Sequence, residues 1–257
     1  MSVRAMWKAS LVIDEMRVPV KLYAAVQDRT VRFRLLERAT RTPVSQHLVD
    51  PETEAIVPFD ATTRGFGPDD ALVSFESAEL EALEPTPSRD VTVVSFVQPE
   101  QIDHRWYVRP YYLGPDGDVS AYAAFARALE ASGLEGVARW TMRSKAYVGA
   151  LRPYRGYPML VTLRHAEEVV PIEQVERPKG KPLDDRQLAM ARQLIGMLEA
   201  PFEVEAYRDE FRERVEHLIA TKRAGEKPEK PAPTRKRRPR GDLDDTLRAS
   251  LKAAAHA

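Results

Sequence analysis

The chain has 257 residues with 39 basic and 39 acidic side chains, so its formal net charge is zero. It contains no cysteine, and its five histidines lie far apart, so we expect no disulfide, no metal and no cofactor. No apolar run approaches the roughly twenty residues of a membrane helix, and Met1 begins no signal peptide, which predicts a soluble, cytoplasmic protein that binds no membrane.

The charge is spread unevenly along the chain. The segment 221–257 is rich in lysine and arginine, which leaves the segment 1–220 mildly acidic. A basic tail on an acidic body indicates that the tail binds a partner of opposite charge.

The segment 1–75 has mostly strand-like patterns. Large apolar residues alternate with other residues over 18–22 and again over 31–35, as they do in half-buried strands. In the second segment, basic residues fall on one face and continue to Arg41.

Residues 44–66 contain few large apolar side chains and a turn at 50–53. Arg64-Gly65-Phe66 closes this segment, where glycine permits a backbone turn that other residues resist. The pattern predicts an extended loop or a long hairpin with little core of its own.

The next stretch contains helix and core signals. A short helix begins at Ser77 and stops at Pro85, and the β-branched run 91–97 predicts a core strand. The aromatic segment 102–115 contains prolines that would hold it rigid, which favours packing over base stacking. A helix is expected at about 118–132, ending at Gly133.

Residues 136–166 carry six basic residues and no acidic one. Basic residues in 139–145 alternate with Trp140 and Met142, so they would share one face of a strand. A turn at 153–156 and a return strand at 159–163 complete a hairpin. Its basic face suits a phosphate backbone, but an ordinary solvated surface explains the pattern equally well.

The pattern loosens at 167–183, which is the best candidate for a domain boundary. Asp184 then caps a helix, and a second amphipathic helix carries Tyr207 and Ile219 on its apolar side. These helices could fold back on the core or pack on a partner subunit. The expected divisions are a core of residues 1–183, a helical segment of 184–223 and a flexible tail of 224–257.

The tail begins as a linker of prolines and lysines. A dense cationic patch follows at 235–240, and Asp242 caps a short helix with leucines at four-residue spacing. Because so short a helix is marginal alone, we expect this end to be disordered until it meets a partner.

The chain contains no nucleophile elbow, phosphate-binding loop, dinucleotide fingerprint or zinc-type histidine pair. An enzyme whose catalytic residues lie far apart in sequence stays open as an alternative. The basic segments offer no recognition helix for reading bases, so they predict a sequence-tolerant, salt-sensitive backbone binder.

Eight segments, in order and spacing, resemble the bacterial Ku family over roughly residues 1–220. They are Ala5-Met6-Trp7-Lys8-Ala9-Ser10, Val18-Pro19-Val20-Lys21-Leu22-Tyr23, Val49-Asp50-Pro51-Glu52-Thr53 with Arg64-Gly65-Phe66, Arg109-Pro110-Tyr111-Tyr112-Leu113, Arg143 through Ala150-Leu151-Arg152-Pro153, Thr162-Leu163-Arg164-His165-Ala166-Glu167-Glu168-Val169, Ala191-Arg192-Gln193-Leu194-Ile195 and Tyr207-Arg208-Asp209-Glu210-Phe211-Arg212. The chain departs from the family at Ala9, where glycine is usual, and at 14–17, which lack the usual glycine and asparagine. Asp50 and Thr53 stand where some relatives carry a cysteine pair, so no zinc is expected.

The resemblance implies a mixed β/α fold: a β-barrel core with a bridging arm at about 36–70, a C-terminal helical segment and a basic tail. It implies a non-enzymatic, nucleoid-associated homodimer whose arms close a ring around double-stranded DNA ends, and which recruits the ATP-dependent DNA ligase D for non-homologous end joining. A sequence-nonspecific nucleic-acid-binding module without a ring is the alternative.

The same resemblance, together with the basic patterns, selects the DNA contacts. Arg139 and Arg164 fit ordinary surface charge. The expected DNA-binding residues are Arg32, Arg34, Arg38, Arg41, Arg64, Arg143, Lys145, Arg152, Arg155, Arg235, Lys236, Arg237, Arg238 and Arg240.

Overall fold

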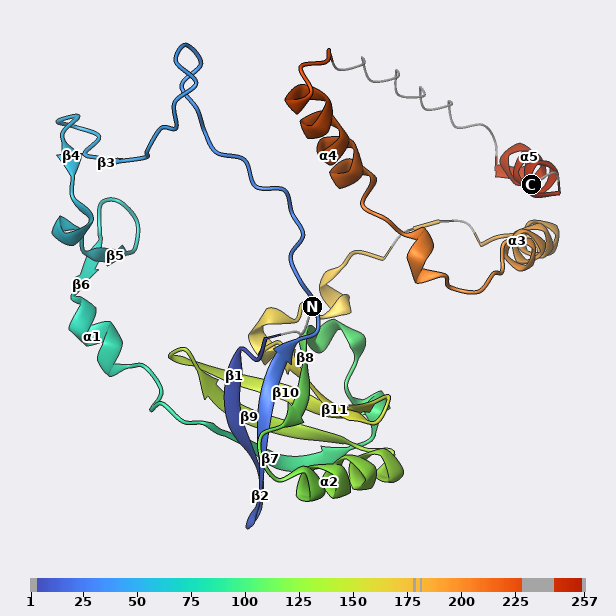
Figure 1. The fold of residues 1–257 in the computed structure, drawn as a ribbon. Coiled ribbons are helices and arrows are strands. Elements are labelled where there is room, and N and C mark those ends of the chain that lie inside the picture. The colour runs from blue at the N-terminus through green and yellow to red at the C-terminus, as the bar shows by residue number, and fades with distance from the viewer. Residues whose placement is uncertain (1–3, 178, 181, 228–242, 256–257) are drawn as a thin grey trace. The chain divides into compact units, whose positions relative to one another are not determined.

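The structure is a computed structural model that describes residues 4–177, 179–180, 182–227 and 243–255 (Figure 1). The chain divides into two compact units. The first consists of Met1–Arg29 and Arg34–Gln174, and the second of Thr30–Phe33 and Val175–Ala257.

The first unit contains a closed barrel of seven strands in the order β1-β2-β8-β11-β10-β9-β7. All neighbours are antiparallel except β1 and β7, whose parallel pairing closes the barrel. This confirms the predicted barrel and the core strand at 91–97. The strands are β1 (Trp7–Ile13), β2 (Met16–Ala24), β7 (Asp90–Val97), β8 (Tyr107–Pro115), β9 (Glu135–Met142), β10 (Lys145–Tyr154) and β11 (Tyr157–Leu163).

The barrel is filled by the inward residues of its strands. Val18, Val20 and Leu22 alternate along β2 and are fully buried, as the period of two predicts. Helix α2 (Val119–Ser132) adds Tyr122, Phe125 and Leu129 to the same core. Asp118 caps α2 by accepting a hydrogen bond from the Ala121 N–H, and left-handed Gly133 ends it, which confirms the predicted helix.

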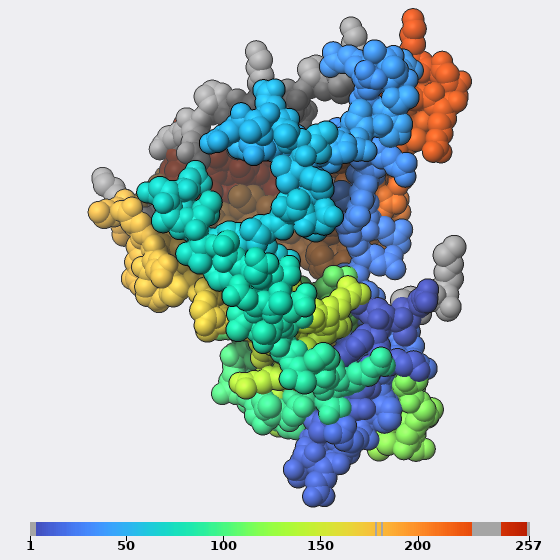
Figure 2. Space-filling model, turned by 90° about the vertical axis from the view of Figure 1, so that its left-hand side faces the viewer, coloured from blue at the N-terminus to red at the C-terminus, as the bar shows by residue number. Residues whose placement is uncertain are grey.

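Between β2 and β7 the chain makes a long insertion, residues 25–89, which we call the arm. The structure describes all of the arm, and none of its residues is buried. Figure 2 shows the arm in blue to teal. Its elements are β3 (Leu48–Val49), β4 (Ile56–Val57), η1 (Phe59–Ala61), β5 (Arg64–Phe66), β6 (Val73–Phe75) and α1 (Ser77–Ala82).

The expectation of little core at 44–66 agrees with this structure, but the strand predicted at 31–35 was wrong. Those residues form no strand, and Phe33 and Leu35 are 71% and 65% exposed. Alternation predicts a strand only where a second strand is available to pair with it, and within the described residues none pairs here.

The second unit contains α3 (Asp185–Met197), η6 (Val204–Ala206), α4 (Glu210–Arg223) and α5 (Leu243–Ala254). Asp184 and Gln187 form the predicted capping box of α3. The terminal segment, expected to be disordered alone, forms α5 and packs on α3 of its own chain. Gln187 Nε2 donates to Asp244 Oδ1 at 2.8 Å, so the partner that this helix needed lies in the same unit.

Short 3-10 turns complete the described chain. They are η2 (Pro99–Gln101), η3 (His104–Trp106), η4 (Ala166–Glu168) and η5 (Ile172–Gln174). Among the described residues, no helix is both long and apolar enough to cross a membrane.

Candidate nucleic-acid interface

The arm exposes all five of its predicted DNA-binding arginines. Arg38 and Arg41 share a tight turn closed by the Leu36–Pro43 bridge and by the Glu37 N–H, which donates to the Thr42 carbonyl at 2.9 Å. The positive φ of Arg41, 58°, belongs to that turn. Arg32 and Arg34 lie outside any helix or strand, and Arg64 begins β5. The exposed set is Arg32, Arg34, Arg38, Arg41 and Arg64.

The basic stretch at 136–166 forms three strands rather than two. Arg143 and Ser144 have φ values of 52° and 59° and make a two-residue turn between β9 and β10. Lys145 therefore lies opposite Met142 and not beyond it on the same strand. The prediction of one basic strand face over 139–145 was wrong, because this turn reverses the chain before the alternation is complete.

The predicted turn near 153–156 is present, at Arg155 and Gly156, with φ values of 49° and 81°. The Arg155 guanidinium carbon lies 5.4 Å from the centre of the Tyr154 ring. Strand β10 runs between the two turns, so Arg143 and Arg155 lie at opposite ends of a strand about 30 Å long. The structure thus separates the hairpin bases into two groups.

Arg152 is engaged by a buried acid. Its Nε donates to Glu135 Oε1 at 2.9 Å, and the Glu135 side chain is only 2% exposed. The second oxygen, Oε2, accepts the Tyr107 hydroxyl at 2.7 Å. The Arg152 guanidinium carbon also lies 5.1 Å from the Tyr107 ring centre. The negative charge of Glu135 offsets the positive charge of Arg152. Arg152 would therefore attract a phosphate less strongly than the exposed arginines near it.

Glu135 had no signal in the sequence, since it lies on β9 while its two partners come from β8 and β10. Glu135 also affects the pKa of the Tyr107 hydroxyl. Burial first, and then the hydrogen bond to Glu135, raises the pKa of Tyr107 to about 12.

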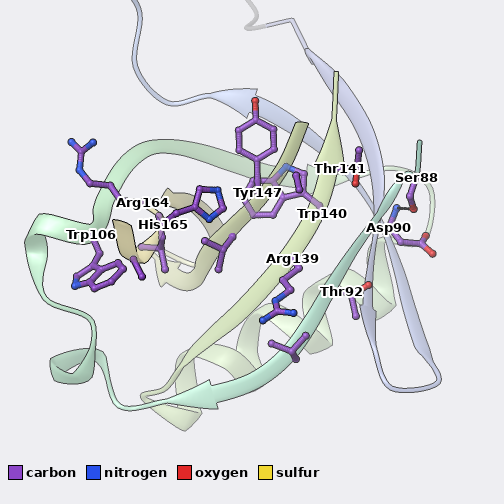
Figure 3. A pocket seen from close by; sticks show the side chains of 15 residues that line it. Ser88, Asp90, Thr92, Trp106, Arg139, Trp140, Thr141, Tyr147, Arg164 and His165 are labelled. Atoms are coloured by element: carbon purple, nitrogen blue, oxygen red, sulfur yellow. Dashed lines mark hydrogen bonds between the residues drawn. The ribbon is translucent and has the colours of Figure 1, made fainter. Parts of the chain in front are cut away.

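A hollow of about 760 Å³ is lined by residues of β7, β9, β10 and the segment after β11 (Figure 3). Arg139 lines it from β9, and Arg164 and His165 line it from the segment after β11. The acid in its lining, Asp90, is held by Arg17 through two bonds of 2.9 and 3.1 Å. The charge that this hollow presents is therefore positive. That Arg139 and Arg164 are ordinary surface charge stays a prediction.

The cationic patch at 235–240 lies outside the described residues. Within the described ranges, no three His, Asp or Glu side chains gather into a cluster that could hold a metal ion.

The barrel is closed, a long exposed arm interrupts it between β2 and β7, and a helical segment follows it in the chain. These features define a β-barrel protein with an inserted arm. A family model described as "Ku70/Ku80 beta-barrel domain" matches residues 12–190. The chain belongs to the Ku family, as its motifs indicated.

The chain is also similar to curated proteins named for this family. It is 33% identical over 222 residues to "Non-homologous end joining protein Ku 2" of Geotalea uraniireducens, covering 86% of each chain. It is 32% identical over 256 residues to the Ku protein of Symbiobacterium thermophilum, covering 98% of this chain and 64% of that one. With the Ku protein of Bacillus subtilis it shares 30% identity over 254 residues, or 96% and 81% of the two chains.

Proposed function

We propose that two copies of this chain close a ring around the end of a DNA duplex, and that the ring serves non-homologous end joining. The observation that carries the proposal is the arm, a long insertion between two strands of a closed barrel in which no residue is buried. Such a segment cannot be explained as part of the barrel core. The relatives named for non-homologous end joining support the assignment.

The exposed apolar residues of the arm support a second copy as its partner. Phe59 and Phe66 are 85% and 78% exposed, and Phe33 is 71% exposed. A partner that covers these three rings would remove their apolar surface from water. A two-fold axis would let the same arm supply both halves of the ring.

The arm arginines would neutralise phosphates, together with Arg143, Lys145 and Arg155 of the barrel and the patch at 235–240. Backbone contacts of this kind give affinity without reading sequence. End specificity would come from topology instead, since a closed ring loads only where the duplex ends.

The ATP-dependent DNA ligase D would be recruited as a partner and would catalyse the joining reaction. We assign no catalytic role to residues of this chain. The tail from residue 225 onward would add nonspecific affinity for DNA and so strengthen binding to long duplexes. Its removal should weaken binding to long DNA and leave threading onto ends intact.

The test compares linear duplex with a covalently closed circle of the same sequence, alongside a mass measurement in solution. A monomer that binds both forms equally would be a nucleic-acid module without a ring.

A further inference from the structure

A second hollow, of about 320 Å³, lies on the outer wall of the barrel near the β10–β11 turn. Tyrosines from four strands surround it, and Arg155 stands at its edge. Its principal lining residues are Tyr23, Tyr112, Gly114, Tyr154, Arg155 and Tyr157. We call it the tyrosine hollow.

Strand register gathers these rings. Tyr23 lies opposite Tyr112 across β2 and β8, and Tyr154 lies opposite Tyr157 across β10 and β11. Directly opposed residues on antiparallel strands project to the same side of the sheet. The Tyr112 and Tyr154 rings stack with centroids 5.9 Å apart. Gly114 is part of this arrangement, because a Cβ there would approach Tyr23 Cε2 to 3.0 Å.

The rings do not serve the barrel core. Tyr111, on the inner side of β8, is 4% exposed, whereas Tyr112 is 37% exposed on the outer side. Tyr154 and Tyr157 are 40% and 57% exposed. Tyr154 already stacks on Tyr112 and carries the Arg155 guanidinium, so Tyr157, the most exposed of the three, is the ring best placed to meet a flat ligand.

The charge of the residues that line the tyrosine hollow indicates that its ligand is an anion. Among the described residues that line the tyrosine hollow, Arg155 is the charged one and none is a carboxylate. Its guanidinium stacks on Tyr154, which leaves its N–H groups to meet an anion at the edge of the rings. Open aromatic faces beside an arginine suit a planar base that carries a phosphate, which is how single-stranded DNA is held in many proteins.

We infer that the tyrosine hollow binds an unpaired nucleobase of a DNA end, by stacking on Tyr157 beside the Tyr112–Tyr154 pair, while Arg155 pairs with its phosphate. The inference rests on the proposed DNA-end function and deepens it. The protein ring formed by two chains would hold the duplex, and the tyrosine hollow would hold the first unpaired base of an overhang.

The experiment uses the full chain and short duplexes that are blunt or carry a three-nucleotide overhang with 5-iodouracil. Irradiation should cross-link the overhang to Tyr112, Tyr154 or Tyr157, located by peptide mass mapping. In a direct titration, the overhang duplex should bind roughly fivefold or more tightly than the blunt one.

Two matched variants separate stacking from hydroxyl contacts. The pair Tyr154→Leu and Tyr157→Leu removes both rings and should abolish the overhang preference while blunt binding persists. The pair Tyr154→Phe and Tyr157→Phe keeps both rings and should retain the preference. Thermal unfolding of each variant checks that the barrel is intact.

Absence of both the cross-link and the overhang preference in the unaltered chain overturns the inference, whether or not the variants fold. A preference that survives in the folded leucine pair overturns it too. The ring proposal fails separately, when circular and linear blunt duplexes bind equally, so the two failures are distinguishable.

Discussion

Glu135 lies buried in the barrel wall, and its carboxylate accepts the Nε–H of Arg152 at 2.9 Å. The Tyr107 hydroxyl completes the acid's coordination from β8. Three side chains from three strands are therefore joined around one buried charge, which would be costly to leave unpaired.

Replacing Glu135 by alanine should lower the free energy of unfolding by about 2 kcal/mol, because the Tyr107 hydroxyl and Arg152 both lose a partner. Denaturant unfolding followed by tryptophan fluorescence measures the change. The exposed Glu130, on α2, provides the control, and Glu130→Ala should change stability far less. Equal effects of the two substitutions would contradict the account.

Alkaline pH should weaken the barrel through Tyr107. Its pKa in the folded chain is about 12, above the ordinary value of 10.0 that it takes on unfolding. Its contribution is therefore complete below pH 10 and lost as the pH rises through 12. The variant Tyr107→Phe should lose less stability over this window than the unaltered chain. Unfolding free energies at stepped pH measure this, with the exposed Tyr207→Phe as control.

Local signals predicted the parts of the fold that depend on neighbours in sequence. Helix α2 follows from Asp118 and Gly133 at its ends, and β2 from the alternation at 18–22. The turn at Arg143 and Ser144 was missed, because neither residue is the glycine or asparagine that usually marks such turns. The Glu135 cluster and the packing of α5 on α3 both join residues distant in sequence, for which local patterns carry no information.

Gly149 should tolerate no side chain. A Cβ there would lie 2.6 Å from the Val161 carbonyl oxygen and 2.7 Å from the Trp140 ring. Gly149→Ala should therefore cost about 1–3 kcal/mol of unfolding free energy in the barrel, as overpacked cores do. Gly196, in α3, has open space around its Cβ position, so Gly196→Ala should leave the barrel transition unchanged. A Gly149→Ala barrel as stable as the unaltered one would refute this packing.

The arm arginines should contribute to the salt dependence of DNA binding. Arg38→Gln combined with Arg41→Gln should reduce the log–log slope of affinity against salt by roughly 1.8, since each phosphate contact contributes about 0.9. Titrations of one duplex at several salt concentrations give the slope. Arg17→Gln removes an arginine that is already paired with Asp90, and should leave the slope unchanged. A slope that the arm substitutions do not alter would exclude these residues as phosphate contacts.

The ring itself is tested most directly by topology. The chain without residues 225–257 is titrated at low salt with a linear duplex and with a covalently closed circle of identical sequence. The ring account predicts that the linear duplex is bound and the circle is not, and that cutting the circle once restores binding. Equal affinity for the circle and the linear duplex would contradict it.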